Sequence, residues 1–235
     1  MSFSPFDVAQ DLIDAPRVGS AQRPKDAATL ILTRGTRRPE ILMGRRAPGH
    51  VFMASKWVFP GGRVDRSDFR AASIGSLALP VMDRLQAEVP PRRAKALALA
   101  AIRETFEETG LILGRAAPSA RVVGPWDAFR QAGALPDLSA LSYVARAITP
   151  PGRSRRFDAR FFTASAEALL ASEPNAGSGE LDEIAWLSLD QARALDLPAI
   201  TRFILNELIE RRSHPDRPLP FVHTVRGRHV VEMRD

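Results

Sequence analysis

The sequence predicts a protein of the α+β class, in which strands and helices pack around a common core. Short apolar segments with the character of strands occur at residues 27–33 and 40–45, and again after residue 140. A long helix rich in Ala and Leu is expected between them, over residues 91–109. The chain of 235 residues is long enough to bury a sizeable core without disulfides or structural metals.

The N-terminal half divides into a leader, a hairpin and an insert. Residues 1–25 are expected to be an N-terminal leader, and residues 26–235 a single domain. The segments 27–33 and 40–45 are predicted to form a hairpin, and 57–59 a further strand. An insert at about 69–90 has apolar runs broken at Pro80, which predict one or two short helices. The insert either caps a substrate pocket or contributes to a possible homodimer surface.

Strand and helix signals also alternate in the C-terminal half. Phe157, Ala159 and Phe161 alternate with polar residues, which predicts a strand with one buried face. Ser188 and Gln191 match a capping box that begins a helix. The expected elements are strands 141–148, 156–163 and 181–187, helices from Ser188 and Pro198, and a hairpin over 221–233 that turns at 226–228.

Three carboxylates on the long helix carry the strongest chemical signal. Glu104, Glu107 and Glu108 are spaced i, i+3 and i+4, so they share one helix face. Such a face favours hard cations, Mg²⁺ or Mn²⁺, which prefer oxygen ligands. The alternative is a solvated charged stripe, which is what most Glu-rich helix faces are.

The segment Phe59-Pro60-Gly61-Gly62 favours the metal-binding interpretation. Together with Arg103-Glu104-Thr-Phe-Glu107-Glu108-Thr-Gly110-Leu111 it resembles the Nudix box, G-x5-E-x7-R-E-U-x-E-E-x-G-U, where U is bulky and apolar. Asp68 stands where the pattern has Glu. Between Asp68 and Arg103 lie 34 residues, far more than the pattern allows, so the box is split.

The split box resembles that of NUDT19-like coenzyme A and acyl-CoA diphosphatases. The related coenzyme A signature matches this chain only in part. Leu42, Arg46 and Ala47 agree with it, whereas Gly44, Val51 and Ser55 replace the expected Thr, Arg and Gly.

The resemblance implies an α/β/α sandwich, with a mixed sheet between helices and the helical insert inside the box. It implies Mg²⁺ or Mn²⁺ held by Glu104, Glu107, Glu108 and the main-chain carbonyl of Gly61, and hydrolysis of a diphosphate bridge. It also implies that Arg103 orients a box carboxylate, alongside the simpler role of an i,i+4 ion pair with Glu107.

Further candidate residues lie outside the box. Glu173, Glu180 and Glu183 are candidates for an additional base or metal ligand, and we favour Glu180 because it follows a glycine-containing loop. Substrate phosphate is expected to bind Arg46, Arg155 and Arg156, with Arg160 nearby. For the last three, a strand that exposes its arginines is an equal alternative.

We expect the substrate to be a nucleoside diphosphate linked to another group, with coenzyme A or acyl-CoA first. Its enzymatic rivals are ADP-ribose, NADH and dinucleoside polyphosphates. A non-catalytic module that binds a nucleotide or RNA is the alternative from another class. The intact Glu104, Glu107 and Glu108 argue against it, because a binding module does not need all three.

The composition of the chain limits which partners we expect it to bind and in which cellular compartment we expect it. The net charge of +6 comes from arginines that are interleaved with acidic residues, so nucleic acid is an unlikely partner. The chain has no cysteine, which excludes disulfides, thiolate metal sites and a cysteine nucleophile. No apolar stretch is long enough for a membrane span, and residues 1–14 do not resemble a secretory signal. We therefore expect a cytoplasmic protein that does not bind membranes.

Overall fold

The computed structural model describes residues 22–49, 53–171, 173–175 and 179–235. The predicted leader lies outside the described residues as far as residue 21. Residues 22–24 lead directly into the first strand.

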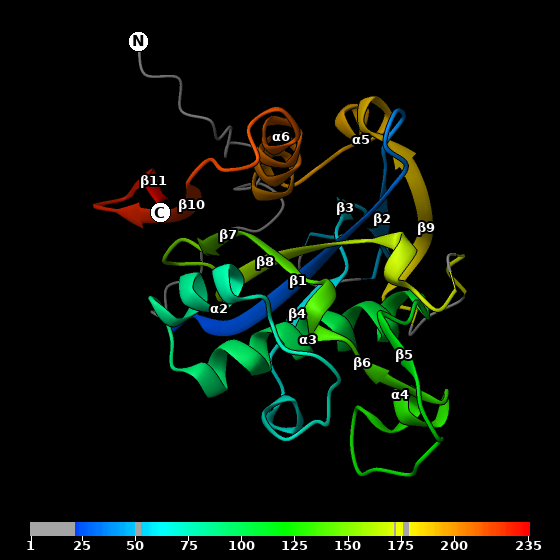
Figure 1. Cartoon of the computed structure of the whole chain (residues 1–235). Helices are drawn as coiled ribbons and strands as arrows, with labels where there is room; N and C mark the ends of the chain where they lie inside the picture. Colours follow the sequence, from blue (N-terminus) through cyan, green and yellow to red (C-terminus); the bar gives the residue numbers. More distant parts are fainter. Residues whose placement is uncertain (1–21, 50–52, 172, 176–178) are drawn as a thin grey trace.

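A mixed β-sheet forms the centre of the molecule (Figure 1). Its strands are β1 (Lys25–Arg34), β2 (Glu40–Arg46), β3 (Trp57–Val58), β4 (Gly61–Arg63), β7 (Ser142–Ile148), β8 (Phe157–Ser165), β9 (Leu181–Ser188), β10 (Leu219–Val225) and β11 (Arg228–Arg234). The main path runs β11-β10-β7-β8-β1-β2-β3, while β4 pairs with β1 and β9 with β2. The pairs β1·β8 and β7·β10 are parallel and the others antiparallel.

Helices cover both faces of this sheet, which gives the expected α/β/α arrangement (Figure 1). One face packs against α2 (Leu79–Gln86) and α3 (Pro91–Thr109), and the other against α5 (Leu189–Ala194) and α6 (Ala199–Ser213). Successive side chains of β1 point to opposite faces of the sheet and so enter two separate cores. Leu30 and Leu32 face the α2–α3 side, whereas Ile31 faces the α5–α6 side.

Most of the predicted elements are confirmed. The hairpin β1–β2, the α3 helix and the hairpin β10–β11 occur where expected, and the Ser188–Gln191 capping box is present. The insert contains one regular helix, α2, after a 3₁₀ turn at Arg66–Phe69. Pro80 does not break this insert helix, because it lies in the first turn of α2, where the missing N–H has no partner to lose.

Two features differ from the sequence prediction. Gly61–Arg63 is not only a turn but a short strand, β4, which pairs with β1. Residues 111–140, which carried no prediction, contain the small hairpin β5 (Gly114–Ala116) and β6 (Ala134–Pro136) with the short helix α4 (Asp127–Gln131). Strands of three residues are too short to show a period in the sequence.

Strand β8 buries both of its faces in different ways. Phe157, Ala159 and Phe161 line a cavity rather than a closed core. On the other face Arg160 is 0% exposed and forms ion pairs with Asp158 and Glu88. The alternative that Arg160 is an exposed surface arginine is therefore wrong, because the strand packs beneath the insert.

Candidate active site

Helix α3, which carries the three glutamates, ends where the sequence predicts. Gly110 follows the last turn with a left-handed φ of 73°, and its N–H donates to the carbonyl of Phe106. The side chain of Asn175 fills the space that a Cβ on Gly110 would need. The backbone N–H of Asn175 also donates to the carbonyl of Thr109, so this residue contacts the end of the helix through both its side chain and its backbone.

Arg103 connects both halves of the split box. Its Nη1 donates to Glu104 at 2.8 Å and to Glu107 at 3.0 Å, and its Nε and Nη2 donate to Asp68 at 2.9 and 3.0 Å. Nη2 also donates to the main-chain carbonyl of Arg63 in β4. Arg103 therefore forms the i,i+4 pair with Glu107 and also pairs with Glu104, and its role in orienting the box carboxylates stays a prediction.

Asp68, in the first half of the box, is an ion-pair partner of Arg103 in the second half. Its carboxylate is fully buried and forms a two-pronged ion pair with Arg103 across 34 intervening residues. Sequence reasoning noted Asp68 only as a departure from the pattern. The sequence places an acid at the first carboxylate position of the box and a base, Arg103, in the second half. This pair of opposite charges was the signal that could have predicted the ion pair.

The glycine segment and the α3 carboxylates meet directly. A Cβ on Gly62 would lie 2.4 Å from Oε2 of Glu104, so any side chain at this position would displace the Glu104 carboxylate. The N–H of Gly61 donates to Oε2 of Glu108 at 3.1 Å. The resemblance to the Nudix box predicts the main-chain carbonyl of Gly61 as a metal ligand. The contact in the structure uses the N–H of Gly61, and ligation by its carbonyl stays a prediction.

Burial dominates the protonation of these carboxylates. It raises the pKa of Glu108 to about 8, with repulsion from Glu104 and Glu180 adding to it. It raises the pKa of Glu104 to about 7, again with Glu107 and Glu180 adding to it. The pKa of Glu107 is also raised, mainly by burial and despite its ion pair with Arg103. Each raised pKa indicates that nearby positive charges do not fully compensate the negative charge of that carboxylate.

Glu180 is the candidate outside the box that the fold brings to this site. Its charge acts on Glu104, Glu107 and Glu108. By contrast, Glu173 pairs with Arg34 and Glu183 with Arg45. Arg46 also lies at the site, because its charge favours the ionised form of Glu108.

These residues form what we call the carboxylate cluster: Asp68, Glu104, Glu107, Glu108 and Glu180, with Arg46 and Arg103. The acids outnumber the arginines; Asp68 and Glu108 are buried, Glu104 and Glu107 are half-buried, and Glu180 is exposed. Within the described residues no three acidic or histidine side chains form a ready ligand set for a metal. Arg103 donates to Glu104 and Glu107, and the N–H of Gly61 donates to Glu108. The donors nevertheless fit a hard divalent cation, because they are all oxygens and carry excess negative charge.

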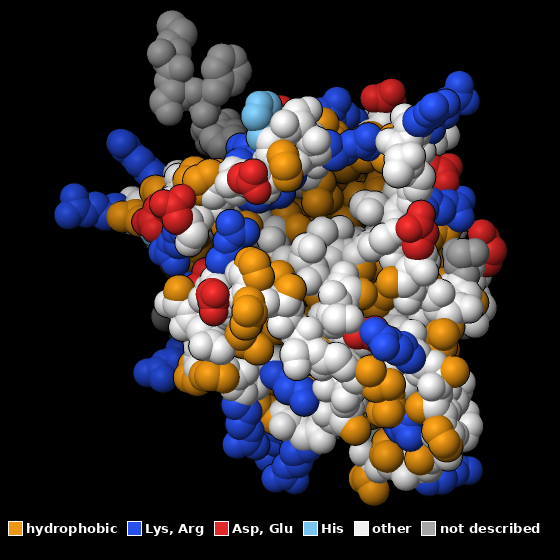
Figure 2. Space-filling model, viewed as in Figure 1, with side chains coloured by type: hydrophobic (Ala, Val, Ile, Leu, Met, Phe, Trp, Pro, Cys, Tyr) orange, Lys and Arg blue, Asp and Glu red, His pale blue; other side chains and the backbone are white. Residues whose placement is uncertain are grey.

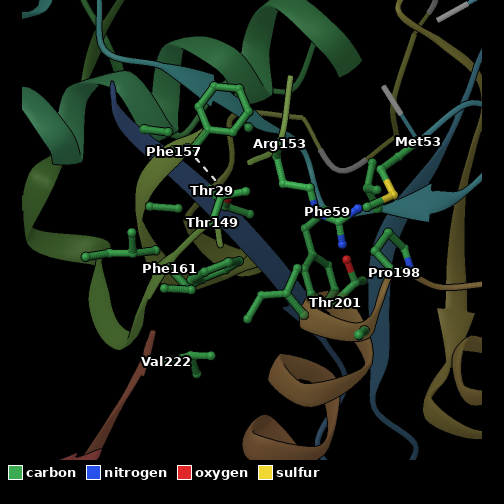
Figure 3. Close-up of a pocket in the computed structure, with 18 of the residues that line it drawn as sticks. Thr29, Met53, Phe59, Thr149, Arg153, Phe157, Phe161, Pro198, Thr201 and Val222 are labelled. Carbon is green, nitrogen blue, oxygen red and sulfur yellow. Dashed lines mark hydrogen bonds between the residues drawn. The ribbon is translucent and has the colours of Figure 1, made fainter. Parts of the chain in front are cut away.

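An apolar cavity of about 230 Å³ borders the glycine segment. Gly61, Gly62 and Arg46 belong to its wall and also contact or act on the carboxylate cluster. Figure 3 shows Phe59, Phe157 and Phe161 on the walls, with Arg153 and Thr201 among them. Figure 2 shows hydrophobic side chains in a hollow beside α6, the helix whose first turn contributes Thr201.

The two predicted substrate arginines of the β7–β8 connection do not line this cavity. Arg155 is exposed, and Arg156 donates to the main-chain carbonyls of Thr149 and Gln22. Arg153, from the same connection, does line the cavity and is buried. Substrate binding by Arg155 and Arg156 stays a prediction; the described geometry favours Arg153 and Arg46.

Comparisons with known proteins agree with this geometry. No family model matches the chain. The chain is similar to the acyl-coenzyme A diphosphatase NUDT19 of Gallus gallus, at 29% identity over 72% of this chain and 62% of that protein, so it spans less than two thirds of that relative's length. A crystal structure of a NUDIX hydrolase from Alicyclobacillus acidocaldarius matches with a TM-score of 0.64 and 27% identity, covering 80% of this chain and 92% of the other.

No helix within the described residues has the length and apolar character to cross a membrane. The mixed sheet between helices, the glycine segment against the carboxylate helix and the two similarities lead to one assignment. The chain has the Nudix fold and is similar in sequence to Nudix hydrolases, among them an acyl-coenzyme A diphosphatase of the NUDT19 type.

Proposed function

We propose that the protein is a metal-dependent diphosphatase. It hydrolyses the diphosphate bridge of a nucleoside diphosphate linked to another group, with coenzyme A or acyl-CoA as the first candidate. One observation carries this proposal: a buried excess of carboxylates meets a glycine segment that is also the wall of an apolar cavity.

The cation would be Mg²⁺ or Mn²⁺, held by Glu104, Glu107 and Glu108 with the carbonyl of Gly61. When bound, it would neutralise charge on the phosphoryl oxygens and make an attacking water more acidic. The negative excess of the carboxylate cluster supports such binding, because burial of uncompensated carboxylates is unfavourable until a cation joins them.

In this proposal, side chains of the protein position the glutamates of α3 and accept the proton of the attacking water. Arg103 keeps Glu104 and Glu107 at one place on α3, and Asp68 holds Arg103 from the other half of the box. Glu180 is exposed and close enough to influence all three helix carboxylates. It is therefore the candidate base that accepts the proton of the attacking water.

The cavity supports a substrate with an organic group beside its diphosphate. Its walls are mainly apolar and aromatic, which suits the nucleoside or the acyl-pantetheine arm. Arg46 stands between cavity and cluster, where a guanidinium suits a phosphate. With coenzyme A, water would add to one phosphorus, the bridging P–O bond would break, and 3′,5′-ADP and phosphopantetheine would leave.

A substrate panel tests the proposal. The full chain is incubated with Mg²⁺ or Mn²⁺ and coenzyme A, acyl-CoA, ADP-ribose, NADH or a dinucleoside polyphosphate, and the products are separated by chromatography. Cleavage of coenzyme A or its acyl ester at the bridge is the expected result. Faster cleavage of one of the other compounds would reassign the substrate.

Turnover of no compound, together with calorimetric binding of one, would instead favour a non-catalytic nucleotide-binding module. Repeating the active reaction in ¹⁸O-labelled water shows which phosphorus receives the oxygen. Size-exclusion chromatography with light scattering tests the predicted homodimer separately.

A further inference from the structure

Trp126 is a buried tryptophan outside both halves of the box. It is 4% exposed, and it immediately precedes α4, in the segment between α3 and β7. Its indole Nε1–H donates to Oδ1 of Asp68 at 2.9 Å. A buried indole N–H needs a hydrogen-bond acceptor, and here that acceptor is the acid that pairs with Arg103.

The carboxylate of Asp68 has four donors. Oδ1 accepts from Arg103 and Trp126, and Oδ2 accepts from Arg103 and the main-chain N–H of Asp65. Removing the indole would leave Oδ1 with Arg103 as its remaining donor among these contacts. Because the carboxylate is fully buried, water cannot readily replace the missing donor.

The contacts continue from Asp68 to the proposed cation ligands. Arg103 uses Nε and Nη2 for Asp68, which leaves Nη1 to donate to Glu104 and Glu107. A small rotation of Asp68 would therefore change the position of the guanidinium between these two glutamates. The indole limits that rotation.

A second contact path joins the same segment to α3. The ring of Trp126 packs edge-on against Phe129 of α4, with centroids 5.3 Å apart. Phe129 packs in the same way against Phe106, at 5.1 Å. Phe106 directly precedes Glu107, so the segment supports the catalytic helix from its apolar side as well.

We infer that Trp126 is a positioning residue for the proposed reaction: through Asp68 and Arg103 it holds Glu104 and Glu107 where a divalent cation binds. The inference rests on the proposed function for its kinetic consequence. Its structural consequence, a link between the indole and the cation site, can be tested without turnover.

The first experiment uses the indole N–H signals in ¹H–¹⁵N spectra of the full chain. The chain has three tryptophans, so each signal is assigned by a Trp→Phe change. Trp126→Phe is the test variant, and Trp186→Phe, which keeps a ring for Arg34, is the matched control. Adding Mg²⁺ should shift the Trp126 signal and leave that of Trp186 in place, and Asp68→Asn should abolish the shift.

The second experiment is a double-mutant cycle on the best substrate of the panel. Trp126→Phe should lower kcat about 10-fold with little change in KM, as is typical of residues that orient ligands. In the Asp68→Asn background the same change should add almost nothing, because its effect passes through Asp68. Trp186→Phe should retain the wild-type kcat.

Each outcome decides a separate question. An unmoved Trp126 signal, or losses that simply multiply in the double mutant, would overturn the inference. If Trp126→Phe does not fold, the Mg²⁺ response of the wild type and of Asp68→Asn still decides. If no compound is turned over but the Trp126 signal moves with Mg²⁺, the proposed function fails while the link to a cation site stands.

Discussion

Two clusters of buried charge lie near opposite ends of α3 and differ in their balance. The carboxylate cluster gathers around Glu104–Glu108. The second, which we call the arginine network, gathers around Arg93, roughly 20 Å away along the helix. Its members are Asp26, Glu88 and Asp158 with Arg93, Arg146, Arg160 and Arg234.

In the arginine network each acid has arginine partners. Arg146 and Arg160 contact Asp158 at 2.8 and 2.7 Å, and Arg160 also contacts Glu88 at 3.2 Å. Burial alone would raise the pKa of Asp158, but these arginines hold it below its ordinary value. The network therefore satisfies its own charges and joins the insert to β7 and β8.

The carboxylate cluster shows the opposite behaviour, because burial raises the pKa of Glu104 and Glu108 to about 7 and about 8. Buried charge alone therefore does not identify a functional site. The imbalance does: a cluster that the protein leaves negative has room for a cation, whereas a balanced one stabilises the fold.

The largest expected effect is on catalysis, from Glu107→Gln. Removing one carboxylate charge should lower kcat by roughly 10²–10⁴-fold, with the thermal transition little changed, because Glu107 is only half-buried. Steady-state kinetics and calorimetry measure the two quantities. Glu210→Gln, the same change on the surface of α6, is the control. Activity that survives Glu107→Gln would show that the metal face is misassigned.

Arg160→Met should do the reverse in the arginine network. It leaves Glu88 and Asp158 short of a buried partner, so the free energy of unfolding should fall by about 3–5 kcal/mol. The folded fraction should keep its kcat. Urea unfolding is the measurement, with Arg212→Met on the exposed end of α6 as control. A loss of kcat without a loss of stability would make the network part of the site.

The pH dependence of stability separates the clusters further. Groups whose pKa is raised by folding stabilise the protein fully below their unfolded pKa and lose that contribution as pH rises through the folded pKa. For Glu104 and Glu108 the window runs from about pH 4.5 to about 8. Metal-free protein should become less stable across it, by about 1.4 kcal/mol for each unit by which folding raises a pKa.

Mg²⁺ should reduce this loss, because it binds the ionised form that high pH produces. Glu108→Gln should flatten the pH profile of the metal-free protein. Thermal melts from pH 5 to 9, with Mg²⁺ and with chelator, give the result. Stability that rises through this range in metal-free protein would contradict the charge imbalance.

The smallest expected effect concerns the cavity. Ile200 of α6 lines it and is half-buried, so Ile200→Trp should fill part of the space with a tolerable change in packing. KM for coenzyme A should rise several-fold while kcat changes little, since a lost contact with a non-reacting group weakens binding. Leu208→Trp, also half-buried on α6 but outside the cavity, is the control. An unchanged KM would place the organic group elsewhere.

Local patterns predicted the helices and strands well where they were long. The i, i+3, i+4 spacing put the three glutamates on one side of α3, and Gly110 ended that helix. Prediction failed for Pro80, whose position within the first turn could not be read from the sequence. It also failed for β5 and β6, where the carbonyl of Pro136 accepts from the N–H of Ile74 in the insert, a contact far apart in the chain.

The sequence by itself determined the resemblance of the chain to Nudix hydrolases and the likeness of its split box to the NUDT19 type. It did so because the motif residues of each half of the box lie within a few positions of one another. Tertiary structure alone decided that Asp68 pairs with Arg103 and accepts from Trp126, that Glu180 rather than Glu173 approaches the cluster, and that Arg160 is buried. These partners are far apart in the chain, so their distances depend on how the sheet, the insert and the loops pack together.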